Sequence, residues 1–188
     1  GAVVGILLAT SCQPIYDRVG GKFSGHPGSM VDRIDDTAHE LIEKAFVETE
    51  DGDLVDYHLH ALSLGTGLKS LCGRTGTTTA YVNPARFDWG EPLWKIKASV
   101  IMSAARIVDR PKADRQYVQR LINLVTAIPR AGTFHILALD AYHGADGQPD
   151  WGKTDIHVPN EYVVELSECL NKRLARPRFV PVISVHPA

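Results

Sequence analysis

The sequence predicts an α/β fold built on a parallel sheet. Three apolar segments have the length and composition of strands, at residues 54–60, 133–140 and 179–185. Amphipathic helical segments separate them, and strands that alternate with helices in this way form parallel sheets. Each predicted strand ends in polar side chains, which a (β/α)8 barrel or an open doubly wound sheet places at its carboxyl edge. No Gly-x-Gly-x-x-Gly follows any of these strands, which disfavours a dinucleotide-binding fold.

Composition limits the class of protein. The chain has 188 residues, of which 44% are hydrophobic, and this is enough to fill one ordinary domain. The formal net charge is -2, the pI is near 6.5, and Lys and Arg are scattered rather than gathered in a stripe. Such a surface has no broad attraction to nucleic acid. We therefore expect a small-molecule substrate and no nucleic-acid partner, and the composition leaves the oligomeric state open.

The first twelve residues, 1–12, resemble an export signal. Residues 2–9 are an unbroken apolar run, followed by Thr10, Ser11 and Cys12. An apolar run that ends in small residues is typical of a secretory signal with its cleavage site. The order Leu-Ala-Thr-Ser-Cys is similar to a bacterial lipobox, in which Cys12 would carry the lipid. We expect an exported protein, periplasmic or anchored to the membrane as a lipoprotein, and a buried first strand is the alternative.

Two cysteines remain besides Cys12, and they leave two interpretations open. Cys72 and Cys169 can pair in an oxidising compartment. Cys169 also falls on the apolar side of a predicted helix, where a buried free thiol fits the pattern equally well. No Cys-x-x-Cys is present, so the sequence does not support a structural zinc ribbon.

Residues 13–35 form a predicted linker, because this segment contains Gly and Pro and has no hydrophobic periodicity. The predicted domain occupies residues 36–188. Its first helix begins with a capping box made by Thr37 and Glu40, and an acidic turn then leads into the first strand. Residues 61–91 contain no clear helix. A loop of this length that leaves the first strand is expected to lie beside a functional site.

Two further helices are predicted before the second strand. Pro92 suits the first turn of a helix that continues to Ile107. Another helix extends from about Asp114, and Pro129 stops it. After the second strand, a polar loop leads to Pro159, where the last predicted helix begins and brings the chain to the third strand.

The end of the first strand carries the main functional signal. His58 and His60 are spaced i and i+2, so both side chains point to the same face of a strand. Two neutral imidazoles side by side on a rigid element can bind one divalent metal ion. Asp56 lies two residues earlier on the same face, where its carboxylate can support a ligand or the strand end. These neighbours favour a metal site, although His-x-His pairs also occur as ordinary polar residues at strand edges.

Polar residues at the other strand ends are the candidate catalytic groups. Asp140, at the end of the second strand, can act as a carboxylate behind the site or as a turn residue. His186, at the end of the third strand, can contact substrate or a bound water, or can hydrogen-bond its own loop. We expect His143 to be solvated and His135 to be structural. The three tryptophans can line the mouth of the site or serve as packing: Trp89, Trp94 and Trp151.

Four segments of the chain share one family pattern. They are Val55-Asp56-Tyr57-His58-Leu59-His60, Ala138-Leu139-Asp140-Ala141 with Asp146-Gly147, Val158-Pro159-Asn160-Glu161-Tyr162-Val163, and the closing stretch from Phe179 to Pro187. With these residues the chain resembles the amidohydrolase superfamily. More narrowly, it is similar to the amidohydrolase-related branch that includes aminocarboxymuconate-semialdehyde decarboxylase. Several metal-hydrolase families share the His-x-His motif, so the later segments carry most of the narrower assignment.

The resemblance implies a distorted TIM barrel that holds one or two divalent ions, with zinc as the expected metal, at its carboxyl-terminal mouth. It implies that His58 and His60 are metal ligands. The other usual ligands are a lysine or glutamate on strand four, histidines on strands five and six, and an aspartate on strand eight. Residues 36–188 would be the N-terminal part, about three β/α units, of such a metal-dependent hydrolase. We expect these units alone to be inactive and poorly folded, because an open sheet leaves the core unclosed.

These features predict a hydrolase in which a metal-activated water attacks an amide, ester or lactone-like bond. In decarboxylating members of the branch the same centre would assist carbon–carbon cleavage, and the sequence does not distinguish these reactions. A PHP-type phosphoesterase or a TatD-like nuclease also begins with an Asp-x-His-x-His strand, but residues 61–87 contain none of the His, Asp or Glu ligands expected next. A non-catalytic exported binding protein is the remaining alternative. A Ser-His-Asp hydrolase is disfavoured because no Gly-x-Ser-x-Gly elbow is present.

Overall fold

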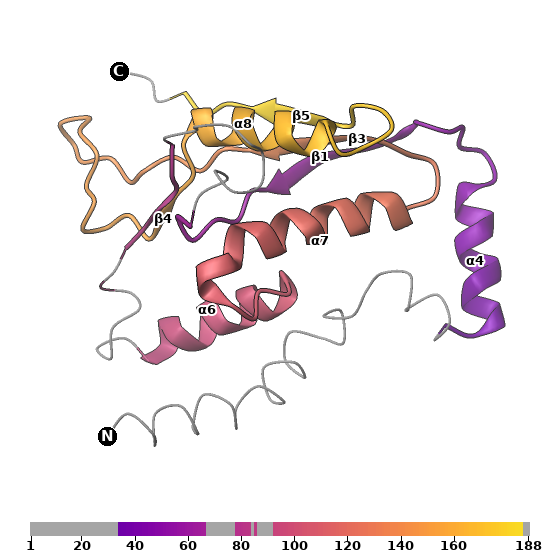
Figure 1. The fold of residues 1–188 in the computed structure, drawn as a ribbon, viewed down its shortest axis with the longest axis horizontal. Coiled ribbons are helices and arrows are strands. Elements are labelled where there is room, and N and C mark those ends of the chain that lie inside the picture. The colour runs from indigo at the N-terminus through magenta and orange to yellow at the C-terminus, as the bar shows by residue number, and fades with distance from the viewer. Residues whose placement is uncertain (1–33, 67–77, 84, 86–91, 186–188) are drawn as a thin grey trace.

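The computed structural model describes residues 34–66, 78–83, 85 and 92–185 (Figure 1). Within this part of the chain, no helix is long and apolar enough to cross a membrane. Several sequence predictions concern residues outside the described part, namely the signal-like segment with Cys12, most of the 13–35 linker, Cys72, Trp89 and His186. They stay predictions.

A three-stranded parallel sheet forms the centre of the structure, as the sequence predicts. The strands are β1 (Leu54–His60), β3 (Ala131–Leu137) and β5 (Phe179–Val182), and they lie in the order β1-β3-β5. Strands that follow one another in the large sheet are therefore neighbours in space, and β3 is central. The second and third strands end earlier than predicted, at Leu137 and Val182. After β3 the N–H of Ala138 still donates to the carbonyl oxygen of Val182, but Leu139 pairs with Val158 instead.

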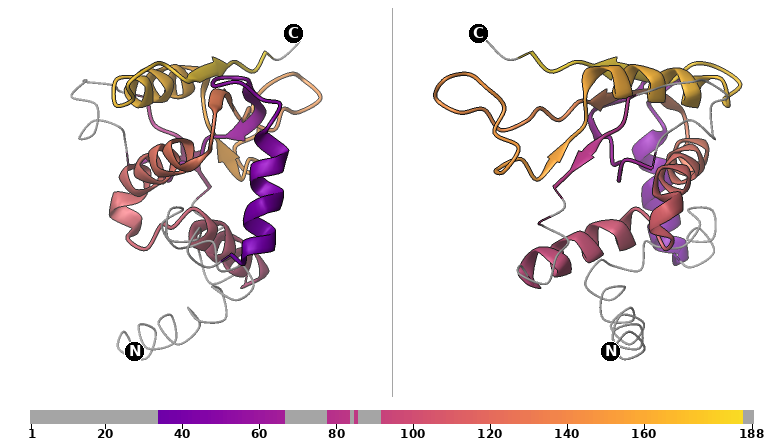
Figure 2. Two further views of the ribbon diagram at one scale, coloured as in Figure 1. Left: turned by 90° about the vertical axis from the view of Figure 1, so that its right-hand side faces the viewer. Right: turned by 60° about the vertical axis from the view of Figure 1, so that its left-hand side comes forward.

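Helices cover one face of this sheet. Helix α7 (Ala113–Ala127) connects β1 to β3 together with α6 (Pro92–Ala104), and α8 (Asn160–Asn171) connects β3 to β5. Both α7 and α8 lie on the same side of the strands (Figure 2). Each is amphipathic, and the side chains that it buries against the sheet recur at helical spacing: Val118, Leu121 and Val125 on α7, and Tyr162, Val163, Leu166 and Leu170 on α8.

The hydrophobic core lies between these two helices and the central strand. Ile136 is fully buried on β3, and Phe134 lies two residues before it on the same face. The ring of Phe134 packs against Phe179 of β5, with 5.8 Å between ring centroids. The packed face of the sheet is therefore the one that faces α7 and α8.

The opposite face of the sheet carries no helix within the described residues. It presents Tyr57 of β1, which is 70% exposed, and His135 of β3. Their rings lie 5.0 Å apart, so these two side chains are cross-strand neighbours. The structural role predicted for His135 agrees with this contact. Exposed apolar side chains of β1 and β5 extend this uncovered face, namely Val55 and Val180.

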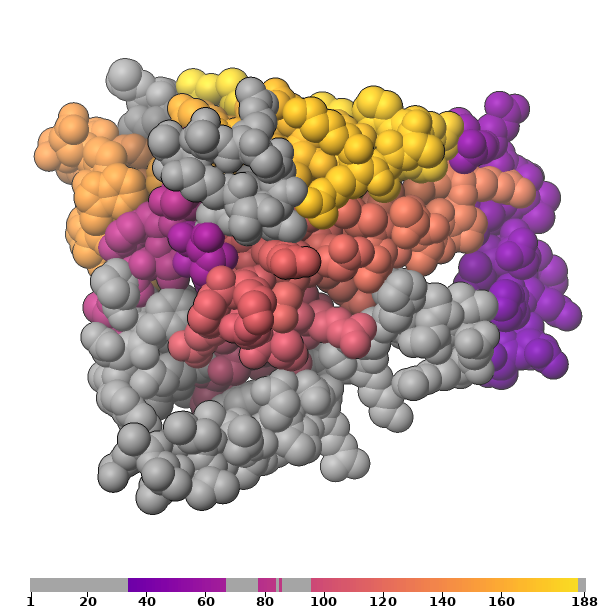
Figure 3. Space-filling model, viewed as in Figure 1, coloured from indigo at the N-terminus to yellow at the C-terminus, as the bar shows by residue number. Residues whose placement is uncertain are grey.

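Helix α4 (Asp36–Phe46) stands apart from the core. None of its residues is buried, and Leu41, on its predicted apolar face, is 62% exposed. In the space-filling view this helix forms one end of the molecule (Figure 3). The predicted capping box at Thr37 is wrong: Asp35 is the N-cap, in extended conformation, and its carboxylate accepts a hydrogen bond from the backbone N–H of Ala38 at 2.8 Å.

A second, smaller sheet lies beyond the carboxyl end of the large one. Strand β2 (Tyr81–Val82) pairs antiparallel with β4 (Ile156–His157). The sequence pattern indicates no strand in either place, because two-residue strands are too short for a period to be visible.

Helix α8 contains Cys169, which is buried and forms a disulfide. Of the two cysteine interpretations, the free thiol is therefore wrong; the two other cysteines, Cys12 and Cys72, lie outside the described residues.

Gly132 is where β1 and β3 begin to pair, and it provides a test of the register. A Cβ atom there would overlap the carbonyl oxygen of Gly52 and lie 2.6 Å from that of Leu54. We expect Gly132→Ala to lower the free energy of unfolding by more than about 3 kcal/mol, because backbone atoms must move apart. Gly147→Ala is the matched control, since its Cβ meets nothing within 4 Å and only the positive φ of 73° opposes it.

The control variant Gly147→Ala should lower the free energy of unfolding by about 1–2 kcal/mol. Urea unfolding followed by circular dichroism measures both variants. A Gly132→Ala protein as stable as Gly147→Ala would contradict the pairing of β1 with β3 at this point.

Candidate metal site and its surroundings

The two histidines of β1 face each other at the end of the strand. Their Nε2 atoms lie 3.0 Å apart, and the rings meet edge to face with centroids separated by 4.6 Å. Two nitrogens bound at about 2.0–2.1 Å to one tetrahedral ion would be roughly 3.3 Å apart. Both side chains are exposed, so an ion can reach them from solvent. The same distance also suits a hydrogen bond between a protonated and a bare ring nitrogen.

The two rings project from an irregular part of β1. The pairing register of β1 with β3 shifts between Asp56 and Leu59, and an irregularity of this kind re-aims side chains at the end of a strand. The backbone N–H of His58, which lies inside the irregular stretch, donates a hydrogen bond of 2.9 Å to Oδ1 of Asp56. Of the two roles predicted for Asp56, the structure therefore shows support of the strand end.

Tyr117 of α7 fixes the backbone of the second histidine. Its hydroxyl donates a hydrogen bond of 2.5 Å to the carbonyl oxygen of His60. The side chain is buried, and burial raises the pKa of the Tyr117 hydroxyl well above its usual range. The hydroxyl thus keeps its proton, and with it the donor function, at every physiological pH.

A buried carboxylate then holds the chain that leaves β1. Asp114 lies in the first turn of α7 and is 1% exposed. Its Oδ2 accepts from the hydroxyl of Ser63 and its Oδ1 from the backbone N–H of Leu64, both at 3.0 Å. The N–H of Asp114 donates in turn to Oγ1 of Thr66 at 3.2 Å. These bonds join residues about fifty positions apart and fix the direction of the segment after the histidines.

Tyr162 of α8 borders the same network. It is 1% exposed, and burial raises the pKa of its hydroxyl, with a further rise from the negative charge of Asp114. The protonated hydroxyl of Tyr162 therefore lies close to the Asp114 carboxylate. The sequence pattern indicates none of the roles of Tyr117, Asp114 and Tyr162, because each residue only continues the period of its helix.

Asp140 takes the turn role rather than a place beside the histidines. It is exposed, its Oδ1 accepts from the backbone N–H of Ala141 at 2.7 Å, and its Oδ2 lies 3.5 Å from the hydroxyl of Ser184. Asp140 also borders a small polar cavity of about 180 Å³ beyond the ends of β3 and β5. Four further polar residues line the same cavity, and the sequence pattern assigns a site role to none of them: His157, Asn160, Glu161 and Ser184.

The other sequence candidates lie apart from the histidine pair. His143 is half-buried, so it keeps part of the solvent contact that the sequence predicts, and its backbone pairs with Pro149 across a turn. Trp151 is partly exposed and stacks edge to face with Tyr81 and His157, at 5.1 and 5.4 Å between centroids. It therefore packs on the small sheet.

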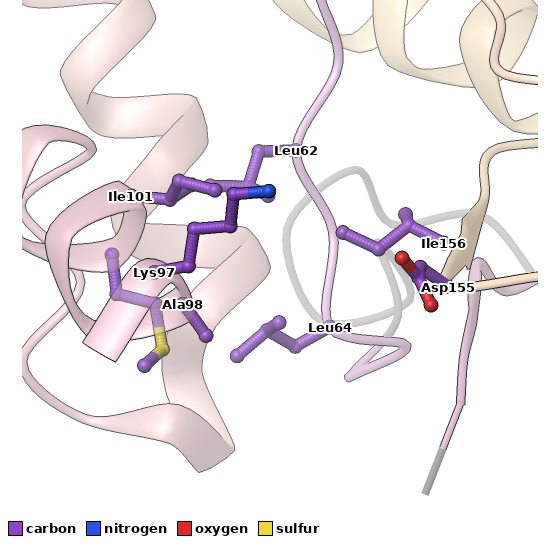
Figure 4. A pocket seen from close by; sticks show the side chains of 8 residues that line it. Leu62, Leu64, Lys97, Ala98, Ile101, Asp155 and Ile156 are labelled. Carbon is purple, nitrogen blue, oxygen red and sulfur yellow. The ribbon is translucent and has the colours of Figure 1, made fainter. Parts of the chain in front are cut away.

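An apolar cavity lies directly after the histidine strand. It encloses about 200 Å³ between α6, β4 and the chain that follows His60 (Figure 4). Leu62 and Leu64 form its wall on the side of that chain, with Lys97 and Asp155 at different sides of the space. The rest of the lining is apolar, namely Ala98, Ile101, Met102 and Ile156.

In the described residues, no third His, Cys, Asp or Glu joins the pair to make a group of three potential metal ligands. Comparisons of the chain with protein-family models, curated proteins and solved structures find no match. The assignment of a function therefore depends on the residues and the geometry of this chain.

Loss of the buried carboxylate should destabilise the protein. In Asp114→Asn, an amide group replaces one acceptor oxygen and the negative charge that the hydrogen bonds from Ser63 and Leu64 favour. We expect the free energy of unfolding to fall by about 2–3 kcal/mol. Asp109→Asn is a matched control near the start of α7, where only an exposed ion pair with Lys112 is lost. It should lower the free energy of unfolding by about 0–1 kcal/mol. Equal urea midpoints for the two variants would contradict the role of Asp114.

The buried tyrosines should make stability decline in alkali. Their pKa values are raised above the ordinary 10.0, so the unfolded chain loses these protons before the folded one does. The contribution of each tyrosine to stability is therefore complete well below pH 10 and is lost as pH rises through and above 10, towards a limiting slope of about 1.4 kcal/mol per pH unit.

Unfolding in urea between pH 9 and 11 measures this slope. Tyr117→Phe and Tyr162→Phe should each reduce the total loss of unfolding free energy between pH 9 and pH 11 by about 1.4 kcal/mol, the contribution of one tyrosine over this range. Tyr142→Phe, at an exposed position, is the control and should leave the slope unchanged. A slope that no buried tyrosine alters would show that these hydroxyls do not couple to folding.

Proposed function

We propose that this chain belongs to a metal-dependent hydrolase of the amidohydrolase type, in which His58 and His60 bind one divalent ion, with zinc as the expected metal. The observation that carries the proposal is the 3.0 Å approach of the two Nε2 atoms at the end of a parallel strand. Neutral imidazoles are common ligands of zinc and of other divalent metals. The resemblance of residues 37–188 to the amidohydrolase-related branch supports the same assignment.

The arrangement of the sheet supports a barrel as the complete fold. Consecutive strands of the large sheet are neighbours, and α7 and α8 lie on one face. A (β/α)8 barrel repeats this step, whereas a doubly wound sheet places helices on both faces. In the proposed barrel the uncovered face with Tyr57 and His135 points inward. Further strands would pair with the free edges of β1 and β5.

The chemistry proposed for the site is hydrolysis. A divalent ion lowers the pKa of water from 15.7 to about 7 and so supplies hydroxide at neutral pH. The residues of this chain hold the site in place: Tyr117 fixes the backbone of His60, and Asp56 fixes that of His58. An amide, ester or lactone-like bond is the expected target, and decarboxylation at the same centre is the second outcome compatible with the resemblance.

Two predicted catalytic groups remain part of the proposal. Asp140 borders a polar cavity at the carboxyl edge of the sheet, where parallel α/β proteins bind their ligands. In the proposal it contacts a small-molecule substrate from that edge. His186 follows β5 in sequence, outside the described residues, and we keep it in the proposal as a second contact with substrate or water.

Two other classes remain as alternatives. A PHP-type or TatD-like phosphoesterase would need more ligands soon after β1, and residues 61–66 and 78–83 contain no His, Asp or Glu. A non-catalytic exported binding protein would use the cavities without a metal. Export itself, with Cys12 as the lipid-bearing residue, is proposed from the apolar segment at residues 1–12.

Metal binding tests the proposal directly. We expect His58→Ala and His60→Ala each to lower the affinity for Zn2+ by more than about tenfold, because each removes one of the two ligands. Isothermal titration of the metal-free protein measures this affinity. His39→Ala, on the exposed surface of α4, is the matched control and should bind as the unchanged protein does. If both site variants retain the affinity of this control, the histidine pair is not a metal site.

A further inference from the structure

The apolar cavity begins where the histidine strand ends. After His60, buried and half-buried residues alternate as Ala61, Leu62, Ser63 and Leu64, which continues the two-residue period of a strand. Ala61 and Ser63 are buried towards the core, and Leu62 and Leu64 line the cavity. Since two extended residues span at most about 7 Å, this wall starts within one small molecule's length of the proposed metal site.

The cavity has the size and lining for a short apolar group. Its volume of about 200 Å³ is somewhat larger than the roughly 150 Å³ of a dry cavity that binds benzene. Ala98 and Met102 are buried at its base. Branched aliphatic side chains from three separate segments, namely Leu64, Ile101 and Ile156, contribute the walls. A branched group of four to six carbons would be enclosed by similar aliphatic surface.

The charges at the cavity are asymmetric. Lys97 extends its amino group along the α6 side, and Asp155 presents its carboxylate from the β4 side (Figure 4). Among the described residues, Lys97 has no carboxylate partner. An anionic group beside Lys97 is attracted by the positive charge of its amino group. With one cationic side chain and a largely apolar lining, the cavity therefore favours an apolar ligand that carries one carboxylate.

We propose that this cavity binds the apolar end of a small monocarboxylate, with the carboxylate beside Lys97, and that this acid is a part of the substrate. The inference rests on the proposed function for its link to catalysis, because only the nearby histidine pair makes the bound acid a substrate. Binding itself requires no metal.

The probe is 4-methylpentanoate, titrated into the metal-free protein and followed by NMR, with 4-methylpentanamide as the neutral comparison. We expect the acid to bind at about millimolar affinity, as a ligand with few atoms does. Lys97→Met should weaken binding of the acid about fivefold, the usual limit for an exposed ion pair, and leave the amide unchanged. Lys112→Met, which alters an exposed lysine outside the cavity, is the matched control and should change neither affinity.

Filling the cavity tests its position. Ala98→Phe should abolish binding of both probes, and Ile101→Trp, at a position that is 44% exposed, should do the same from the rim if the first variant fails to fold. If a folded variant with a filled cavity, Ala98→Phe or Ile101→Trp, still binds the probes, they do not bind in this cavity and the proposal is overturned. Equal affinity for the acid and the amide overturns the role of Lys97.

A double variant separates this inference from the proposed function. In His58→Ala/His60→Ala, the acid should still bind as it does to the unchanged protein, although Zn2+ does not. If the acid binds the unchanged protein but the histidine variants show no loss of Zn2+ affinity, the binding site stands and the proposed catalytic function falls. If Zn2+ binding behaves as expected and the acid does not bind, the inference fails alone.

Discussion

One buried carboxylate organises the surroundings of the candidate site. Asp114 accepts hydrogen bonds from the side chain of Ser63 and the backbone of Leu64, and a carboxylate withdrawn from water persists only when its oxygens are satisfied in this way. These bonds tie the chain after β1 to the start of α7. The histidines directly precede this segment, and Leu62 and Leu64 within it line the apolar cavity. The hydrogen bonds of Asp114 therefore help to position both the histidine pair and the cavity wall.

The pattern of the sequence predicts the large sheet and its helices well. Periods of two and of 3.6 residues are strong local signals, so the three parallel strands, α7 and α8 follow from residues that are close in sequence. The pattern also predicts that His58 and His60 share a face. The predicted cap of α4 fails because both Asp35 and Thr37 are good N-cap residues, and only the backbone conformation decides between them.

The contacts that complete the site could not be predicted, because they join distant positions. Nothing near Tyr117 in sequence indicates that its hydroxyl reaches the carbonyl of His60, and the register shift of β1 beside His58 has no local signature. The polar cavity beside Asp140 likewise requires β4 and the start of α8 to meet. Such features arise from the packing of elements, which periodicity does not encode.

Buried and half-buried residues alternate in the segment after β1, and the two sets of positions are under different evolutionary constraints. Ala61 and Ser63 face the core, so selection for stability restricts these positions. Leu62 and Leu64 face the cavity, and replacing one apolar side chain by another there changes the space available to a ligand more than the fold. A descendant of this protein could therefore acquire a new ligand preference by substitution at every second position of one short segment, while the intervening residues keep the scaffold intact.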